Sequence, residues 1–330
     1  ATTEIYTLSL HDALSICGER FDGHAFVAQA IADGAVAAMV DARWAAAHAG
    51  AALPLVVVDD TRLALGALAA AWRAGFGLPL IGITGSNGKT TVKEMCAAIM
   101  RAQASLAASG GDVVLATRGN LNNDIGLPLT LLELRDHHRA AVIEMGMNHP
   151  GEIAYLTRLA RPTVAIVNNA QRAHLQGVGT LTEVAREKGC IYEGLRDDGV
   201  AVINVDDPHA AYWRELNDGR RIVTFGIDHD ADVRGQCTLH GLGARLVLDT
   251  AQGRVDIVLQ VPGLHNARNA VGAAAACLAA GASLDAVAAG LSDFSGTRGR
   301  LQKRAGPRGS VILDDSYNAN PDSIRAGIDV

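Results

Sequence analysis

The sequence predicts an α/β fold whose centre is a doubly wound, mainly parallel sheet with helices on both faces. Two observations predict it. Short runs of β-branched residues alternate with helical stretches along most of the chain, which is the order that parallel sheets require. The composition agrees, since 49% of the residues are hydrophobic but only 4% are aromatic. Alanine, glycine, valine and leucine dominate the apolar residues, as in proteins whose Ala-rich helices cover a Val/Ile sheet.

Size, charge and cysteine usage exclude several classes of protein. A chain of 330 residues corresponds to about two domains. The formal net charge of −6 argues against a general nucleic-acid binder, so we expect no nucleic-acid partner. No apolar run approaches the roughly 18–20 residues that span a bilayer, so we expect no membrane partner. The five cysteines form no Cys-x-x-Cys pair, which is typical of reduced thiols in a cytoplasmic protein.

The N-terminal part predicts a small, incomplete domain. Residues 1–16 carry no secretory signature and differ in texture from the rest of the chain, so we leave them unassigned and expect them to be non-native. Residues 17–76 predict a partial N-terminal α/β domain. Its predicted elements are a helix at 26–34, strands at 35–40 and 55–59, and a helix at 61–72.

Residues 77–297 predict the central domain, after a linker at 75–79 that glycine and proline punctuate. The predicted strands are 80–84, 140–145, 163–168, 200–205 and 221–225. The predicted helices are 90–101, 124–134, 152–160, 181–195 and 208–216, with 266–281 and 284–291 further along the chain. Between residues 232 and 261 the alternating pattern predicts antiparallel strands added to the sheet, including 244–248 and 255–261.

Residues 298–330 predict the start of a further domain. A strand at 310–313 is followed by a polar turn and a nascent helix. One strand and one helix cannot close a hydrophobic core, so we expect a truncated C-terminal domain of Rossmann-like type.

The strongest motif is a glycine-rich turn between the strand at 80–84 and the helix after it. It reads Thr84-Gly-Ser-Asn-Gly-Lys-Thr-Thr91. Glycines let backbone N–H groups approach phosphate oxygens, and the helix N-terminus adds a partial positive charge. Lys89 would reach the β- and γ-phosphates and Thr90 would ligate Mg²⁺. The candidate nucleotide-binding residues are Gly85, Ser86, Asn87, Gly88, Lys89, Thr90 and Thr91. The alternative is a glycine-rich turn that binds nothing.

This loop resembles the ATP loop of the Mur ligase family, which includes the folylpolyglutamate synthetases. The resemblance continues in order through Asn120–Gly126, Glu144–Gly146, Asn168-Asn169, Ala173-His174-Leu175, Lys188-Gly189, His265-Asn266, Asn269, Gly299-Arg300 and Asp314–Pro321. Some details resemble the members that add D-alanyl-D-alanine to UDP-N-acetylmuramoyl-tripeptide. They are Gly18–His24, Gly119–Gly126, Glu144–His149 and Tyr317–Asp322.

The resemblance implies a reaction, two cofactors and a set of metal ligands. In such ligases ATP phosphorylates a carboxylate and an amine then attacks the acyl phosphate, with Mg²⁺ bound at the phosphates. Lys89, His174 and Lys188 are the implied catalytic residues, Lys188 as a carbamate. Thr90, Glu144, His174 and Lys188 are the implied metal ligands. The alternatives are a solvated strand-end carboxylate for Glu144, a surface histidine for His174 and a solvated helix lysine for Lys188.

The resemblance also implies that residues 17–76 bind the UDP end of a substrate and that residues 298–330 begin the C-terminal ligase domain. It further implies residues that contact the nucleotide and the substrate. Asn266 and Asn269 would lie beside the adenine, although Asn266 could instead only cap its helix. Arg300 and Asp315 would reach ATP from the last domain, Arg300 as a phosphate clamp and Asp315 as an acceptor of ribose hydroxyl groups. Asn122 and Asn123 would bind the UDP-linked peptide substrate.

We therefore expect an ATP-dependent amide ligase of peptidoglycan precursor synthesis that is cytoplasmic and monomeric. Its expected partners are UDP-N-acetylmuramoyl-tripeptide and D-alanyl-D-alanine. Another Mur ligase or a folylpolyglutamate synthetase-like enzyme stays open as an alternative. A further alternative is a nucleotide-binding module without turnover, since we expect these 330 residues to bind ATP and Mg²⁺ weakly and to ligate little.

Overall fold

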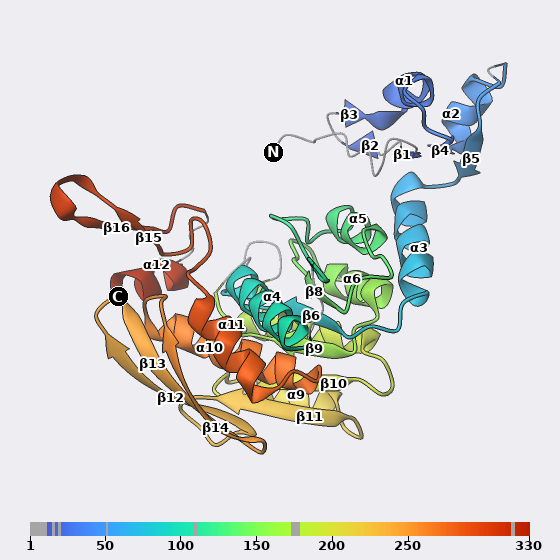
Figure 1. Cartoon of the computed structure of the whole chain (residues 1–330). Coiled ribbons are helices and arrows are strands. Elements are labelled where there is room, and N and C mark those ends of the chain that lie inside the picture. Colours follow the sequence, from blue (N-terminus) through green and yellow to red (C-terminus); the bar gives the residue numbers. More distant parts are fainter. Residues whose placement is uncertain are drawn as a thin grey trace.

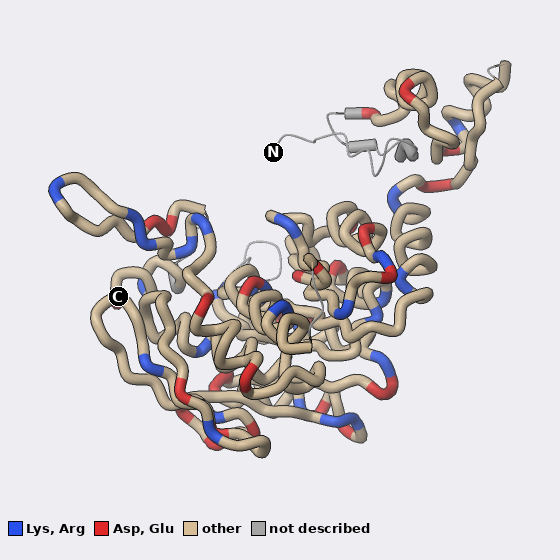
Figure 2. Tube along the Cα trace, viewed as in Figure 1, with Lys and Arg blue, Asp and Glu red and all other residues tan. Residues whose placement is uncertain are grey.

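The computed structural model describes residues 12–14, 17–18, 21–50, 52–107, 111–172, 179–317 and 321–330. A large central part carries two smaller parts, one at the far end of helix α3 and one that begins with a β-hairpin (Figure 1). Acidic and basic residues are interspersed along the chain trace (Figure 2). Among the described residues, no helix combines the length and the apolar character needed to cross a membrane.

The central part is built on a nine-stranded sheet with the order β14-β13-β12-β11-β10-β9-β6-β8-β7. All neighbours from β7 to β12 pair in parallel, and β12, β13 and β14 pair antiparallel. The strands are β6 (Leu80–Thr84), β7 (Val114–Ala116), β8 (Ala140–Glu144), β9 (Val164–Val167), β10 (Val200–Asn204), β11 (Arg221–Gly226), β12 (Val233–His240), β13 (Gly243–Thr250) and β14 (Gly253–Leu259). The predicted fold class is confirmed.

Helices cover both faces of this sheet. Side chains alternate along each strand, so Ile81 and Val142 pack into one core while Leu80 and Ile143 pack into another. The first core is closed by α4 (Lys89–Leu106), α10 (Leu264–Ala279) and α11 (Leu284–Asp293). The second is closed by α5 (Gly126–Leu132), α6 (Glu152–Ala160), α8 (Leu181–Gly189), the 3₁₀ helix η2 (Cys190–Gly194) and α9 (Ala210–Leu216). Because both faces of the sheet are buried, its central strands are continuous runs of apolar residues.

The N-terminal part has its own small sheet, in which β1 (Asp12–Leu14), β4 (Ala37–Asp41) and β5 (Leu55–Val58) pair in parallel. The remaining elements are the β2–β3 pair (Cys17–Gly18 and Phe21–Asp22), η1 (Gly23–Phe26), α1 (Val27–Ala32) and α2 (Ala42–Ala47). Helix α3 (Thr61–Ala74) then leads to the central part, and its first turn is capped by the Asp60 carboxylate. The predicted helices and strands of this part are confirmed to within a few residues.

The last part holds an antiparallel hairpin, β15 (Gln302–Ala305) with β16 (Val311–Asp314), followed by α12 (Pro321–Ile328). The 3₁₀ helix η3 (Pro307–Gly309) forms the turn of the hairpin. The sequence predicted β16 but not β15, because Gln302-Lys-Arg-Ala305 is polar and shows no alternation.

The sequence missed one element of the central part and predicted another wrongly. Strand β7 was not predicted, because it is only three residues long. The helix predicted at 181–195 is instead α8 followed by η2. The two helices meet at Gly189, where an added Cβ would lie 2.9 Å from Leu216 Cδ1 and 3.3 Å from Trp213 Cδ1. Beyond the break the Ile191 carbonyl accepts a hydrogen bond from Thr157 Oγ1 at 2.7 Å, which ties η2 to α6.

Candidate active site

The phosphate loop lies between the buried strand β6 and the N-terminus of α4. Its backbone is held by the end of β9, since Ser86 N donates to Asn169 O at 3.0 Å and Asn87 N donates to Asn169 Oδ1 at 2.9 Å. Gly88 precedes the helix with φ of 79°, and a Cβ there would lie 2.3 Å from Asn269 Oδ1. Glycine is therefore required at this position by both conformation and space.

Lys89 is the first residue of α4 and folds back over the loop. Its Nζ donates to the carbonyl oxygen of Gly85 at 2.8 Å and to that of Ser86 at 3.4 Å. Burial lowers the pKa of Lys89, the Glu144 carboxylate opposes this shift, and the Arg300 guanidinium adds to it. Lys89 is thus within electrostatic range of an acidic group from β8 and a basic group from the last part of the chain. Thr90 and Thr91 follow on the first turn of α4, half-buried and buried respectively.

Glu144 ends β8 at the same sheet edge and is 2% exposed. Its Oε1 accepts a hydrogen bond from Asn122 Nδ2 at 2.7 Å, whereas its buried Oε2 has no partner among the described residues. The alternative of a solvated carboxylate is therefore wrong. A buried carboxylate with an open oxygen is costly unless a cation completes it, and oxygen ligands are those that Mg²⁺ prefers. The residues at this edge fit the implied metal.

Lys188 lies on α8 and is 1% exposed, so the alternative of a solvated helix lysine is also wrong. Burial and the nearby charge of Lys89 lower its pKa well below the usual range, and Glu187 opposes the shift only in part. A lowered pKa favours the neutral amine, which is the form that can react with CO₂. His174, the other implied metal ligand, lies outside the described residues.

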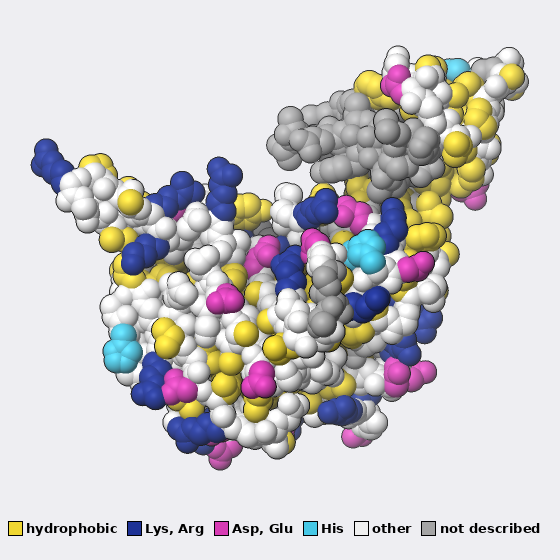
Figure 3. All heavy atoms as spheres, viewed as in Figure 1, with side chains coloured by type: hydrophobic (Ala, Val, Ile, Leu, Met, Phe, Trp, Pro, Cys, Tyr) yellow, Lys and Arg dark blue, Asp and Glu magenta, His cyan; other side chains and the backbone are white. Residues whose placement is uncertain are grey.

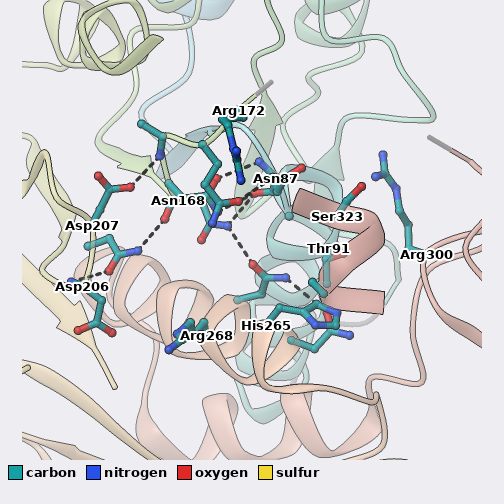
Figure 4. Close-up of a pocket in the computed structure, with 18 of the residues that line it drawn as sticks. Asn87, Thr91, Asn168, Arg172, Asp206, Asp207, His265, Arg268, Arg300 and Ser323 are labelled. Atoms are coloured by element: carbon teal, nitrogen blue, oxygen red, sulfur yellow. Dashed lines mark hydrogen bonds between the residues drawn. The ribbon is translucent and has the colours of Figure 1, made fainter. Parts of the chain in front are cut away.

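A network of buried amides joins the phosphate loop to α10 (Figure 4). Asn168 Nδ2 donates to Asn87 O and to Asn269 Oδ1, both at 2.9 Å. Asn269 Nδ2 donates weakly to Asn266 Oδ1 at 3.4 Å, and Asn266 Nδ2 donates to Pro262 O at 2.8 Å. The alternative that Asn266 caps α10 is wrong, because Gly263 is the N-cap residue and the Asn266 side chain accepts no bond from the first turn.

A cavity of about 700 Å³ opens between this network, the end of β10 and the last part of the chain. Asn266, Asn269, Arg300 and Asp315 all line it, so the structure brings together four predicted residues from two regions. The Arg300 guanidinium lies 4.6 Å from the centre of the Tyr317 ring. Asp315 Oδ1 accepts a hydrogen bond from Leu301 N at 3.2 Å. The volume of the cavity is typical of a site for a small molecule.

Asn122 and Asn123 lie outside that cavity and bond within the protein. Asn122 Nδ2 holds the Glu144 carboxylate. Asn123 Oδ1 accepts from Gly126 N at 2.8 Å and from Ile125 N at 3.3 Å, which holds the turn before α5. Their role toward a substrate stays a prediction.

Comparison with known proteins identifies the family. The model of the Mur ligase middle domain matches residues 83–277, the stretch that contains the loop, Glu144 and Lys188. The chain belongs to the Mur ligase family. It is 42% identical over 316 residues to a UDP-N-acetylmuramoyl-tripeptide–D-alanyl-D-alanine ligase of Haemophilus influenzae, covering 95% of this chain and 66% of the relative. The chain thus spans about two thirds of the length of such curated relatives.

Solved structures of Mur ligases agree with the sequence comparison. MurF from Acinetobacter baumannii superposes with a TM-score of 0.87 at 40% identity, over 96% of this chain and 67% of that one. MurF from Thermotoga maritima, solved in complex with ADP, gives a TM-score of 0.81 at 25% identity, over 96% of this chain and 70% of that one.

Several residues of this Mur ligase site were missed by sequence reasoning. Asp206, Asp207 and Arg268 line the cavity and were not predicted, whereas Asn168 and His265, which also line it, were quoted for the resemblance but given no role toward a ligand. Asp207 Oδ2 accepts from Ala170 N at 2.7 Å, which joins the end of β10 to the segment after β9. One signal could have found the aspartates: they follow a buried strand directly, at the edge where open α/β sheets bind ligands.

Proposed function

We propose that the chain carries the activity for which its relatives are named, the ATP-dependent addition of D-alanyl-D-alanine to UDP-N-acetylmuramoyl-tripeptide. The observation that carries the proposal is the buried Glu144 carboxylate within electrostatic range of Lys89, with an Oε2 that has no partner among the described residues. The buried Lys188, whose pKa Lys89 helps to lower, supports it. Identity of 42% over nearly the whole chain to a ligase of that name supports the substrates.

The reaction that we propose has two steps. A carboxylate oxygen of the tripeptide attacks the γ-phosphorus of ATP, forming an acyl phosphate and releasing ADP. The amine of D-alanyl-D-alanine then attacks the acyl carbon, forming the amide and releasing inorganic phosphate and a proton. The first step brings two anions together, so it needs concentrated positive charge. Lys89 would supply a fixed charge at the β- and γ-phosphates, and Arg300 would add another from the last part of the chain.

Thr90, Glu144, His174 and a carbamylated Lys188 are the residues that we propose to hold Mg²⁺. Bound Mg²⁺ would neutralise phosphate charge and polarise the transferred phosphoryl group. The neutral amine of Lys188 would form its carbamate by adding to the carbon of CO₂ with loss of one proton. The product would be an anion beside the Lys89 ammonium, so that an attraction between opposite charges would replace the repulsion that lowers the pKa of Lys188.

We assign recognition of the nucleoside to the cavity between the amide network and the last part of the chain. We propose that Asn266 and Asn269 present amide groups toward the adenine and that Asp315 accepts ribose hydroxyl groups. The same proposal assigns the reaction to the cytoplasm, where ATP and UDP-linked sugars are available, and expects a monomer, which light scattering would test.

Release of ADP by the full-length protein tests this function. With UDP-N-acetylmuramoyl-tripeptide present, we expect D-alanyl-D-alanine to stimulate ADP release and free amino acids to leave it unchanged. Stimulation by glutamate with a folate, and none by D-alanyl-D-alanine, would favour the folylpolyglutamate synthetase alternative instead. Binding of ATP without release of ADP in the presence of any pair of substrates would favour a nucleotide-binding module without turnover.

A further inference from the structure

Lys93 is a buried charged residue that the proposed reaction does not use. It lies one helical turn beyond Lys89 on α4 and is 1% exposed. Its Nζ donates to Thr117 O at 2.7 Å and to Glu94 Oε1 at 2.5 Å. Taking an ammonium group out of water costs free energy unless its donors are satisfied. The bonds of Lys93 satisfy two of them, and one fixes a backbone carbonyl on a different element.

That carbonyl belongs to the first residue after β7, Thr117, which is itself 1% exposed. Thr117 N donates to Val142 O at 3.1 Å, and Thr117 Oγ1 accepts from Glu144 N at 2.9 Å. A chain of hydrogen bonds therefore runs from the Lys93 ammonium on the phosphate-loop helix, through Thr117, to the backbone of Glu144 on β8.

The segment that begins at Thr117 also grips the Glu144 carboxylate. Asn122 Nδ2 donates to Glu144 Oε1, and Asn122 O accepts from Gly146 N at 2.8 Å. The two segments approach closely here, because a Cβ added at Gly146 would lie 2.8 Å from Asn122 Oδ1 and the Asn122 side chain would have to shift. Glu144 is thus fixed at its backbone by Thr117 and at one carboxylate oxygen by Asn122, while the other oxygen stays open.

We propose that Lys93 is a positioning residue for the metal ligand Glu144. By tying Thr117 to α4, it keeps a fixed spacing between the first turn of α4, which carries Lys89 and Thr90, and the open oxygen of Glu144. Lys93 is buried behind Thr117 and contacts no reacting atom, so it acts through Glu144. This inference rests on the proposed binding of Mg²⁺ with the nucleotide.

Direct metal binding tests the proposal without relying on turnover. Mn²⁺ replaces Mg²⁺ as the probe, and electron paramagnetic resonance reports its binding to the 330-residue chain in the presence of ADP. We expect Lys93→Met to raise the Kd for Mn²⁺ about tenfold or more, the usual cost of losing a group that orients a metal ligand. Its affinity for ADP without metal should not change, because the loop and the cavity stay intact. The control Lys303→Met removes an exposed lysine on β15 and should leave both constants within about twofold.

A second variant separates positioning from a general role in folding. Thr117→Val keeps the shape of the side chain but removes the oxygen that accepts from Glu144 N, and it too should raise the Kd for Mn²⁺. Because both residues act through the same chain of hydrogen bonds, the double variant should bind Mn²⁺ no more than about twofold more weakly than the weaker single variant. If Lys93→Met lowers the unfolding temperature, Thr117→Val alone decides the question.

Three results would overturn the inference. They are an unchanged Kd for Mn²⁺ in Lys93→Met, an unchanged Kd in Thr117→Val, and losses that multiply in the double variant. Each leaves the proposed function intact. A wild-type chain that binds no Mn²⁺ with ADP would instead overturn both.

Discussion

The central part and the N-terminal part bury their strands to different extents. Strands β6 and β8 are buried at every position, whereas β5 has two exposed valines, Val56 at 53% and Val57 at 52%. The fully buried core of the N-terminal part consists of Val27, Ala38 and Val40 among the described residues. Hydrophobic side chains also remain on the surface along α3 and the N-terminal part (Figure 3).

The difference shows where the precision of the site comes from. The loop, Glu144 and the amide network all lie at the edge of a sheet that is packed on both faces. The N-terminal part instead shares a small cluster with the central part, in which Met39 of β4 and Leu65 of α3 pack with Leu129 of α5. It therefore depends on the central part for its placement, while the candidate nucleotide site is built without it.

The largest expected effect breaks the site within the central part. Lys89→Ala should reduce ATP-dependent turnover of the full-length protein by more than about 100-fold, because it removes a charge aimed at the transferring phosphate. The free energy of unfolding should change little, since Lys89 is only half-buried. A steady-state ADP-release assay measures the first quantity and denaturant titration the second. If Lys89→Ala kept the turnover of the wild type, the loop would not be part of the active site.

Leu65→Ala tests the dependence of the N-terminal part on its docking cluster. Leu65 is fully buried between the two parts, so its truncation should cost about 2–5 kcal/mol of packing. Limited proteolysis should then release the N-terminal part first, while ADP binding persists. If Leu65→Ala also abolished ADP binding, the candidate nucleotide site would depend on the docking of the N-terminal part, which would contradict the separation between the two parts.

Gly88→Ala and Gly50→Ala form a matched pair across the two parts. A Cβ at Gly88 would clash with Asn269 Oδ1 in a left-handed conformation, whereas nothing lies within 4 Å of a Cβ at Gly50. We expect Gly88→Ala to cost about 1–3 kcal/mol and to weaken ADP binding. Gly50→Ala should fall within about 0.5 kcal/mol of the wild type. Equal effects in denaturant titrations would show that the loop is not under this constraint.

The smallest effect is a pH dependence that Lys188 should confer. Its folded-state pKa is lowered, so the unfolded chain binds more protons between that pKa and about 10.4, and stability should rise with pH in this window. The slope is at most about 1.4 kcal/mol per pH unit. Lys188→Met should remove it in bicarbonate-free buffer, and unfolding titrations from pH 7 to 9.5 would measure the difference. Identical slopes would show that Lys188 titrates normally.

The buried, regular elements were the ones that sequence could predict. Leu80–Thr84 and Glu152–Ala160 were predicted with their observed bounds, because an apolar run and a helical period mark them. Strand β7 and strand β15 were missed because three residues and a polar stretch carry too little pattern. The break in the helix predicted at 181–195 was missed because Gly189, where it occurs, packs closely against Leu216 and Trp213, and no local pattern shows such distant contacts.

The same distinction holds for the site. Lys89, Glu144 and Lys188 were found because a motif and a resemblance name them, and the structure adds that two of the three are buried. Lys93 was not found, because a Lys-Glu pair on a helix has the appearance of a solvated surface. Only the fold shows that its ammonium group meets Thr117, 24 residues away.

One binding measurement tests the central claim, that the open oxygen of Glu144 completes a metal site at the phosphate loop. Calorimetric titration of ADP into the chain, with and without Mg²⁺, compares the wild type with Glu144→Gln. We predict that Mg²⁺ tightens ADP binding about 10- to 100-fold in the wild type and has no effect in Glu144→Gln. An equal effect of Mg²⁺ on both proteins would contradict the claim.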